Sequence, residues 1–333
     1  MKRAGHLIER IAHQDNLAEA FLRAARGKGN NQQVMHFRNN INNELEVISE
    51  ELLNGTYRFS DYYEFIIFDP KKRKICAAAF RDRVTMHAMM RICHPVFDAY
   101  QISDSYASRV GKGTYKALSR AQRFLSHNTW YAKLDMCRYF DSINHDTLLE
   151  QLNRLFKDKA LMAYFEQLVR NYETTELRGL PIGNLTSQYF ANHYLSVADH
   201  YLKERLHAKY IIRYMDDLLL FDSDRDRLRD TIASYREYVE QQLKLYLHNP
   251  VVNKTRYGIP FLGYVLFNNR MHLNQRSRRR FRNRLMEYEN AFEDGHFNEA
   301  DYHKRLTSLY AFATKANVTP LMKRITDEFG ILP

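Results

Sequence analysis

The sequence predicts a fold that mixes helices and strands, either α/β or α+β, and three observations carry this expectation. Apolar residues recur at helical spacing near both ends of the chain. In the middle, short apolar or alternating runs of strand type lie between segments of helical period. No internal repeat or low-complexity linker divides the 333 residues, which suffice for one large domain or two to three subdomains sharing a core.

The first part of the chain is expected to hold long helices around one hairpin. Residues 5–55 carry apolar residues at helical spacing and end at a glycine, a typical residue after a helix. Aromatic and β-branched residues flank the turn DPKKRK, which predicts a β-hairpin over about 62–80. Helical spacing returns over 84–100, with a break expected near Pro95, and a loop and a further helix follow to about residue 126.

The remainder alternates strands with helices and then becomes helical. Strand patterns occur at 130–140, at 209–222, where two short strands are expected, and at 258–267. Helical patterns occur at about 145–156, after the loop GLPIGNLTSQ, at 226–243, and from about residue 275 to the end.

The composition indicates a protein with an anionic partner. Lys and Arg number 50 against 39 Asp and Glu, giving a formal charge of +11 and an isoelectric point near 9.4. Nucleic acid is the commonest such partner for a basic protein. No apolar stretch approaches the roughly 20 residues of a membrane span, and the start MKRAGHLIERIAHQDN is too polar for a signal peptide. Three cysteines without a CxxC pair indicate reduced thiols, so we expect a cytoplasmic protein with no membrane partner.

The run RYMDDLLLF, residues 213–221, places Asp216 and Asp217 inside an apolar segment. Burying an unpaired carboxylate is costly, but a tight hairpin would bury both strands while its tip faces a cleft that holds a cation. Asp135 ends another strand-type run 81 positions earlier. If the fold joins these carboxylates, they can hold two Mg²⁺ ions roughly 3.5–4 Å apart for phosphoryl transfer. Each feature alone is more often a solvated turn or a helix cap.

Six segments in order make the chain resemble the reverse transcriptases over about residues 57–267. They are FRDRVTMHAM, SYASRVGKG, LDMCRYFDSI, LPIGNLTSQ, YMDD and NKTRYGIPFLGY. The resemblance implies an α+β right-hand polymerase with RNA-directed DNA polymerase activity and two Mg²⁺ ions, or Mn²⁺ in their place. It also implies an RNA template, a nucleic-acid primer and deoxynucleoside triphosphates as ligands.

The resemblance also implies a division of the chain. We expect an N-terminal helical extension (1–60), fingers (61–130), a palm with an antiparallel sheet (131–267, with insertions around 150–190) and a short helical thumb (268–333). About 66 residues follow the primer-gripping segment. These are too few for a ribonuclease H or endonuclease domain, so template removal and integration are expected to belong to other proteins.

One motif narrows the resemblance to the reverse transcriptases of diversity-generating retroelements. Most reverse transcriptases have Gln-Gly-x-x-x-Ser-Pro where this chain has Ile182, Gly183 and, at the end of the motif, Ser187 and Gln188. An aliphatic residue in place of the first Gln removes a polar contact to the templating region, so errors are expected. The subtype implies error-prone copying of a template-repeat RNA opposite adenine, a small basic helical-bundle accessory protein, and a bacterial or phage-encoded chain.

The motifs carry residue roles with them. Asp135 and Asp216 are implied as metal ligands, Asp217 as a supporting carboxylate, Phe140 as the ring that excludes a 2′-hydroxyl, and Lys254 as the proton donor to pyrophosphate. The nucleotide is expected to contact Lys74, Arg81, Arg83, Arg109, Phe140, Ile182, Gly183 and Gln188. Template and primer are expected to contact Gly263, Arg276, Arg278, Arg279, Arg280, Arg282 and Arg284. The competing interpretation of each basic residue is solvated surface charge.

Two kinds of alternative stay open. Another bacterial reverse transcriptase, of the retron type or of a phage-defence type that polymerises without a template, would share most of these motifs. A catalytically inactive nucleic-acid-binding scaffold would share the fold, although the intact carboxylates Asp135, Asp216 and Asp217 argue against it.

Overall fold

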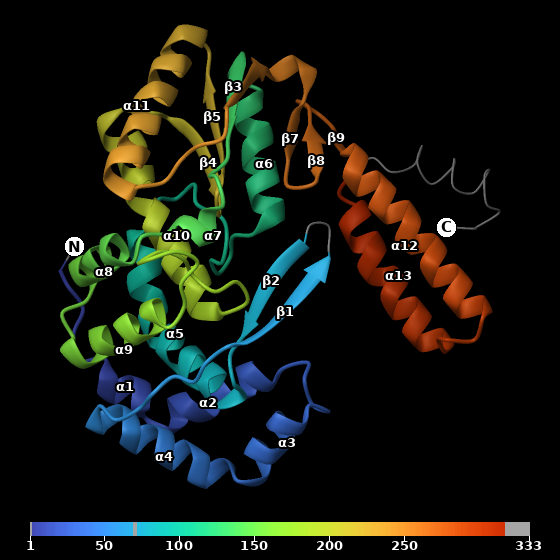
Figure 1. Ribbon diagram of the computed structural model, residues 1–333. Helices are drawn as coiled ribbons and strands as arrows, with labels where there is room; N and C mark the ends of the chain where they lie inside the picture. Colours follow the sequence, from blue (N-terminus) through green and yellow to red (C-terminus); the bar gives the residue numbers. More distant parts are fainter. Residues whose placement is uncertain (1, 69–71, 317–333) are drawn as a thin grey trace.

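The computed structural model describes residues 2–68 and 72–316 of the chain. Figure 1 shows a group of helices at one end, a β-sheet at the other, and a helix pair that projects to the side. The N-terminal group packs against the long helix α5 (Phe80–Tyr100) and confirms the helical expectation for 5–55. Its members are α1 (Ile8–Ala12), α2 (Gln14–Ala25), α3 (Gln32–Asn39) and α4 (Ile41–Asn54).

The expected hairpin is confirmed as an antiparallel pair of β1 (Tyr63–Phe68) and β2 (Lys72–Ala77). Residues 69–71 of its turn lie outside the described residues, as do residues 317–333 of the expected C-terminal helical segment. The prediction of a helix break near Pro95 was wrong, because α5 runs on to Tyr100. A proline removes one backbone donor from a helix, but Cys93 and Phe97 on either side of it are buried and hold the helix in the core.

The central sheet is antiparallel and has the order β4-β5-β3-β6. Its strands are β3 (Trp130–Leu134), β4 (Tyr210–Tyr214), β5 (Asp217–Asp222) and β6 (Val251–Lys254). Helices α10 (Leu185–His200) and α11 (Arg225–Leu243) belong to the core on one face. The other face packs on α6 (Thr114–Leu125) and on a second sheet of β7 (Ile259–Phe261), β8 (Tyr264–Leu266) and β9 (Met271–Leu273). Because both faces are covered, Leu218, Leu219, Leu220 and Phe221 are all buried, which explains the unbroken apolar run.

Two expected strands are shorter than their sequence patterns. The pattern over 130–140 ends as a strand at Leu134, and its last residues form the single turn α7 (Tyr139–Ser142) after Arg138, whose φ is +44°. The pattern over 258–267 is the hairpin of β7 and β8, because Leu262 and Gly263 have φ values of +47° and +90° and turn the chain. The remaining elements are α8 (His145–Leu155), α9 (Lys159–Arg170), a π-helical turn (Tyr201–Arg205), a 3-10 turn (Thr255–Tyr257), α12 (Gln275–Glu293) and α13 (Glu299–Ala313). No helix in the described ranges combines the length and the apolar character of a membrane span.

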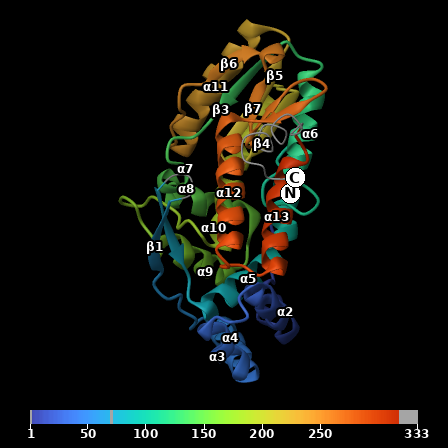
Figure 2. The same cartoon turned by 90° about the vertical axis from the view of Figure 1, so that its right-hand side faces the viewer.

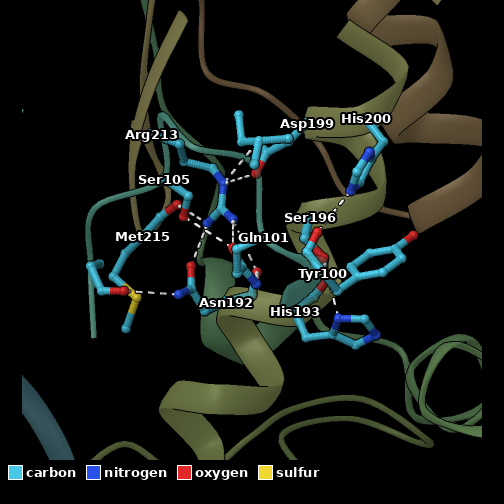
Figure 3. A network of polar contacts seen from close by, with 12 residues as sticks. Tyr100, Gln101, Ser105, Asn192, His193, Ser196, Asp199, His200, Arg213 and Met215 are labelled. Atoms are coloured by element: carbon cyan, nitrogen blue, oxygen red, sulfur yellow. Dashed lines mark hydrogen bonds and ion pairs between the residues drawn. The ribbon is translucent and has the colours of Figure 1, made fainter. Parts of the chain in front are cut away.

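A buried ion pair joins the sheet to α10 (Figure 3). Arg213 on β4 and Asp199 on α10 are both 0% exposed, and Nε of Arg213 donates to the Asp199 carboxylate oxygens at 2.9 and 2.7 Å. Burial raises the pKa of Asp199, and the charge of Arg213 opposes that shift. The pair therefore ties β4 to α10 inside the core.

The other donors of Arg213 reach α10 again and two further segments. Its Nη1 donates to the side-chain oxygen of Asn192 at 2.6 Å and to the backbone oxygen of Met215 at 3.1 Å. Its Nη2 donates to Gln101, just after α5, at 2.9 Å. A single guanidinium thus joins the end of α5, helix α10 and the turn between β4 and β5.

We expect Arg213→Met to lower the free energy of unfolding by about 3–5 kcal/mol, because Asp199 would be left buried without its cation. The matched control is Arg227→Met, which removes an exposed arginine from the carboxylate of Asp222. Pairs of that kind contribute about 0–1 kcal/mol. Denaturant unfolding of both variants measures the difference, and similar losses for the two would contradict the prediction.

Candidate active site

Three carboxylates meet at one end of the central sheet. Leu134 on β3 pairs with Leu218 on β5, so Asp135 follows directly at the point where the β4–β5 connection begins. That connection consists of Met215 and Asp216, with Met215 at a φ of +54°, and Asp217 is the first residue of β5. The expected tight hairpin is confirmed, and strand pairing brings together residues that lie 81 positions apart.

The electrostatics of Asp216 reflect this convergence. Burial raises the pKa of Asp216 to about 6, and the negative charges of Asp135 and Asp217 add to that shift. Lys133, one residue before Leu134, lies with Nζ 3.1 Å from the Asp217 carboxylate and neutralises it in part. A cation placed near Asp135 and Asp216 would relieve the cost of ionising Asp216.

The residues present fit Mg²⁺ only if substrate and water supply part of its ligands. Within residues 2–68 and 72–316, no group of three or more His, Cys, Asp or Glu side chains is arranged to hold a metal by itself. Mg²⁺ is usually bound by one or two carboxylates together with substrate phosphates, and Mn²⁺ prefers the same oxygen ligands. Asp135 and Asp216 supply such ligands, so the remaining ones would come from substrate and water.

The loop after residue 179 connects the segment of Phe140 to strand β2. Leu180 donates its backbone N–H to the carbonyl of Phe140 at 2.8 Å, and the carbonyl of Ile182 accepts from Cys76 on β2 at 2.8 Å. Gly183 has a φ of +121°, and a Cβ there would lie 3.0 Å from the carbonyl oxygen of Cys76. Only glycine therefore allows this close approach. The structure thus joins Phe140 and the Ile182 loop to the hairpin strand β2.

Two further site residues have partners of their own. Phe140 is half-buried and packs edge-on against Tyr139, whose hydroxyl donates to the carbonyl of Ala191 on α10. Gln188 accepts a hydrogen bond from the hydroxyl of Ser108 at 3.2 Å. Phe140 is thereby placed on a short helix anchored to the core.

The hairpin strand β2 contributes a cation that the sequence analysis missed. Successive residues of a strand face opposite sides, so Arg73 and Lys74 cannot both face the carboxylates. The positive charge of Arg73 lowers the pKa of Asp216, whereas Lys74 lies 2.9 Å from Glu64 and over the ring of Tyr172. Alternation along the predicted strand could have shown that only one of the two neighbours faces the site.

Three other cations expected at the nucleotide are engaged elsewhere. Arg81 pairs with Glu51 at 2.9 Å, and the guanidinium of Arg83 lies 3.4 Å from the carbonyl of Ala78. Arg109 pairs with Asp98 at 2.7 Å, and its other nitrogens donate to backbone carbonyls of residues 98, 102 and 105. The described structure brings none of these three to the carboxylates by any contact.

Lys254 lies at the other end of the sheet. It pairs with Trp130, the first residue of β3, whereas Asp135 follows the last one. At about 3.3 Å per residue, this separation is roughly 16 Å along the strand, well beyond the reach of a lysine side chain. The structure therefore does not bring Lys254 to Asp135 and Asp216.

The arginine run begins helix α12, next to the β7–β8 turn. A Cβ at Gly263 would lie 3.0 Å from the hydroxyl of Ser277 on α12, so the turn packs closely on this helix. Helical spacing separates the arginines into different faces. Arg276, Arg280 and Arg284 share one face and Arg278 and Arg282 another, while Arg276, Arg278, Arg279 and Arg280 are exposed.

Comparison with known proteins shows that the chain is similar in sequence to several of them. A putative COX1/OXI3 intron 1 protein of Saccharomyces cerevisiae is 25% identical over 169 residues, which are 48% of this chain and 20% of the yeast protein. The protein YkfC of Escherichia coli is 25% identical over 175 residues, 49% of this chain and 46% of YkfC. The chain thus spans less than half the length of either relative.

A solved structure supports the fold class. Telomerase from Candida albicans, with a fragment of telomeric RNA, superposes with a TM-score of 0.50 at 13% identity, covering 66% of this chain and 46% of the telomerase chain. This likeness confirms an α+β fold of the right-hand polymerase class. The family described as "Reverse transcriptase (RNA-dependent DNA polymerase)" matches residues 69–266, more than half of the chain and the whole of the carboxylate site. The chain therefore belongs to the reverse transcriptase family.

Proposed function

We propose that the chain is an RNA-directed DNA polymerase that extends a primer on an RNA template. One observation carries the proposal: β3 and the β4–β5 turn bring Asp135 and Asp216 to one end of a buried sheet, with Asp217 beside them. Two carboxylates that share a site and serve metal ions are the requirement for in-line nucleotidyl transfer. In this proposal the hairpin β1–β2 belongs to the fingers, the central sheet to the palm, and α12 and α13 to the thumb.

The residues of the chain divide the work. Asp135 and Asp216 would hold Mg²⁺, which when bound activates the primer hydroxyl and stabilises charge on the reacting phosphate. Lys133 keeps Asp217 oriented beside them. Arg73 would contribute positive charge from β2 for the triphosphate, and the ring of Phe140 would exclude a 2′-hydroxyl.

The proposed subtype is a diversity-generating reverse transcriptase. Ile182 and Gly183 support it, because the loop that carries them contacts β2 and the aliphatic side chain of Ile182 has no hydrogen-bonding group. The proposal includes error-prone copying of a template-repeat RNA opposite adenine and a small basic helical-bundle accessory protein. A second candidate is a reverse transcriptase of an intron, favoured by the 23–25% identity to intron-encoded proteins.

Primer extension by the full chain tests the function. With Mg²⁺, an RNA template, a DNA primer and deoxynucleoside triphosphates, we expect cDNA that follows the template sequence, assayed with and without the accessory protein. Asp135→Asn removes a metal ligand and is expected to abolish extension. Product that ignores the template would favour the untemplated type, and absence of product under all these conditions would favour the inactive scaffold.

Asp216→Asn is expected to abolish extension and yet to stabilise the metal-free protein. The pKa of Asp216 is raised to about 6, so ionising this carboxylate destabilises the folded protein. This destabilisation is absent at low pH and fully present above pH 6. Two pKa units correspond to about 3 kcal/mol, so we expect a gain of about 2–3 kcal/mol at pH 8 that shrinks below pH 6. Denaturant unfolding measures it. Added Mg²⁺ should stabilise the parent more than the variant, and equal responses would contradict metal binding at Asp216.

Arg73→Ala is expected to raise KM for the deoxynucleoside triphosphate about tenfold, since a charge-assisted hydrogen bond contributes about 1.5–3 kcal/mol. Lys72→Ala is the matched control, because Lys72 is a neighbouring exposed cation on the opposite face of the same strand. Steady-state extension kinetics measure both. A larger effect from Lys74→Ala than from Arg73→Ala would contradict the assignment.

Ile182→Gln is expected to reduce misincorporation opposite template adenine several-fold, because the amide restores a polar contact worth on the order of 1 kcal/mol of discrimination. Sequencing of the cDNA product measures the errors. An unchanged error frequency opposite adenine would show that Ile182 does not determine the fidelity of this enzyme.

A further inference from the structure

A basic pocket lies at the end of the central sheet that is remote from the carboxylates. It has a volume of about 810 Å³ and is enclosed by the end of α6, the segment after β6 and the turn between β8 and β9. We call it the distal pocket, and its cations are Lys254, Arg256 and Arg270. Figure 1 shows β3 running from this end of the molecule toward α7.

The charged residues that line the pocket are all basic. No Asp or Glu lines it, and within the described part of the chain Lys254, Arg256 and Arg270 form no ion pair. Their charged groups instead lie over aromatic rings, Lys254 5.3 Å from the centre of Trp130 and Arg270 5.2 Å from that of Phe267. Three cations line the pocket without a carboxylate, so an anion in the pocket would be bound favourably.

The lining also offers neutral polar groups, and the residue after Arg256 adds an exposed aromatic ring beside the pocket. Asn268 and Asn269 are exposed at the pocket, and amide side chains can hydrogen-bond the edges of bases. Next to Arg256, the ring of Tyr257 is 59% exposed, and Arg256 lies 4.8 Å from its centre. Cations next to an exposed aromatic ring are the combination by which proteins hold unpaired nucleotides.

We propose that the distal pocket binds an unpaired segment of RNA, outside the cleft in which polymerisation takes place. The inference rests on the proposed function, since it takes the RNA to be part of the template molecule. A duplex presents its phosphates on a convex surface, whereas a concave site of several hundred Å³ accepts a single nucleotide unit. The pocket is roughly 16 Å along β3 from Asp135, so one RNA can occupy both places.

The experiment measures binding of a short, unstructured, fluorescent RNA to the full chain by anisotropy. The polymerase cleft is first saturated with unlabelled template–primer duplex, so that the labelled RNA reports the second site. Arg256→Glu combined with Arg270→Glu is expected to weaken binding at least about tenfold. Loss of two phosphate contacts should lower the slope of log affinity against log salt by about 1.4.

A second variant keeps the test independent of charge. Tyr257→Ala removes a stacking face and is expected to weaken RNA binding about fivefold or more while the salt slope stays the same. The matched control is Arg154→Glu combined with Arg205→Glu, the same charge change at two exposed arginines on other surfaces. Circular dichroism of each variant confirms that it is folded.

Three outcomes would overturn the proposal: unchanged RNA affinity in both pocket variants, an equal loss in the control, or inorganic phosphate competing at constant ionic strength as strongly as unlabelled RNA. The last would mark a small-anion site. Extension of a preformed short template–primer by the Arg256→Glu, Arg270→Glu variant should stay within twofold of the parent. If the parent extends no primer, the proposed function fails, and the binding comparison still decides the pocket.

Discussion

The buried ion pair of Arg213 and Asp199 is the interaction on which the geometry of the carboxylate turn depends. Both side chains are fully buried, so neither charge can exist there without the other. The arginine also donates to the carbonyl of Met215, the residue before Asp216. The position of one carboxylate of the proposed metal site is therefore set by a contact made inside the core, remote from solvent.

The turn itself is costly to the fold. Both faces of the central sheet are covered, and burial together with neighbouring carboxylates raises the pKa of Asp216 to about 6. A protein selected for stability alone would place a neutral residue there. In the proposed metal site a cation would recover the free energy lost by ionising Asp216, so stability and metal affinity would oppose each other at this residue.

The two ends of the central sheet have opposite charge. Asp135 and Asp216 lie at one end, and Lys254, Arg256 and Arg270 lie at the other, with the length of β3 between them. Lys254 therefore lies away from the carboxylates, where its expected role would require it to be. Its strand neighbour is Trp130, and the rigidity of the sheet keeps it away from the carboxylates.

The sequence by itself determined the class of fold, the tight turn at Asp216 and the family, because these depend on local periodicity, turn chemistry and the order of motifs. It could not decide which cations face the site. Arg73 and Lys74 are adjacent in sequence, and only the pairing of β2 with β1 places the first toward Asp216 and the second toward Glu64. Arg109 is likewise drawn to Asp98 by tertiary packing. The direction of a long side chain depends on partners distant in the sequence, and only the tertiary structure supplies those partners.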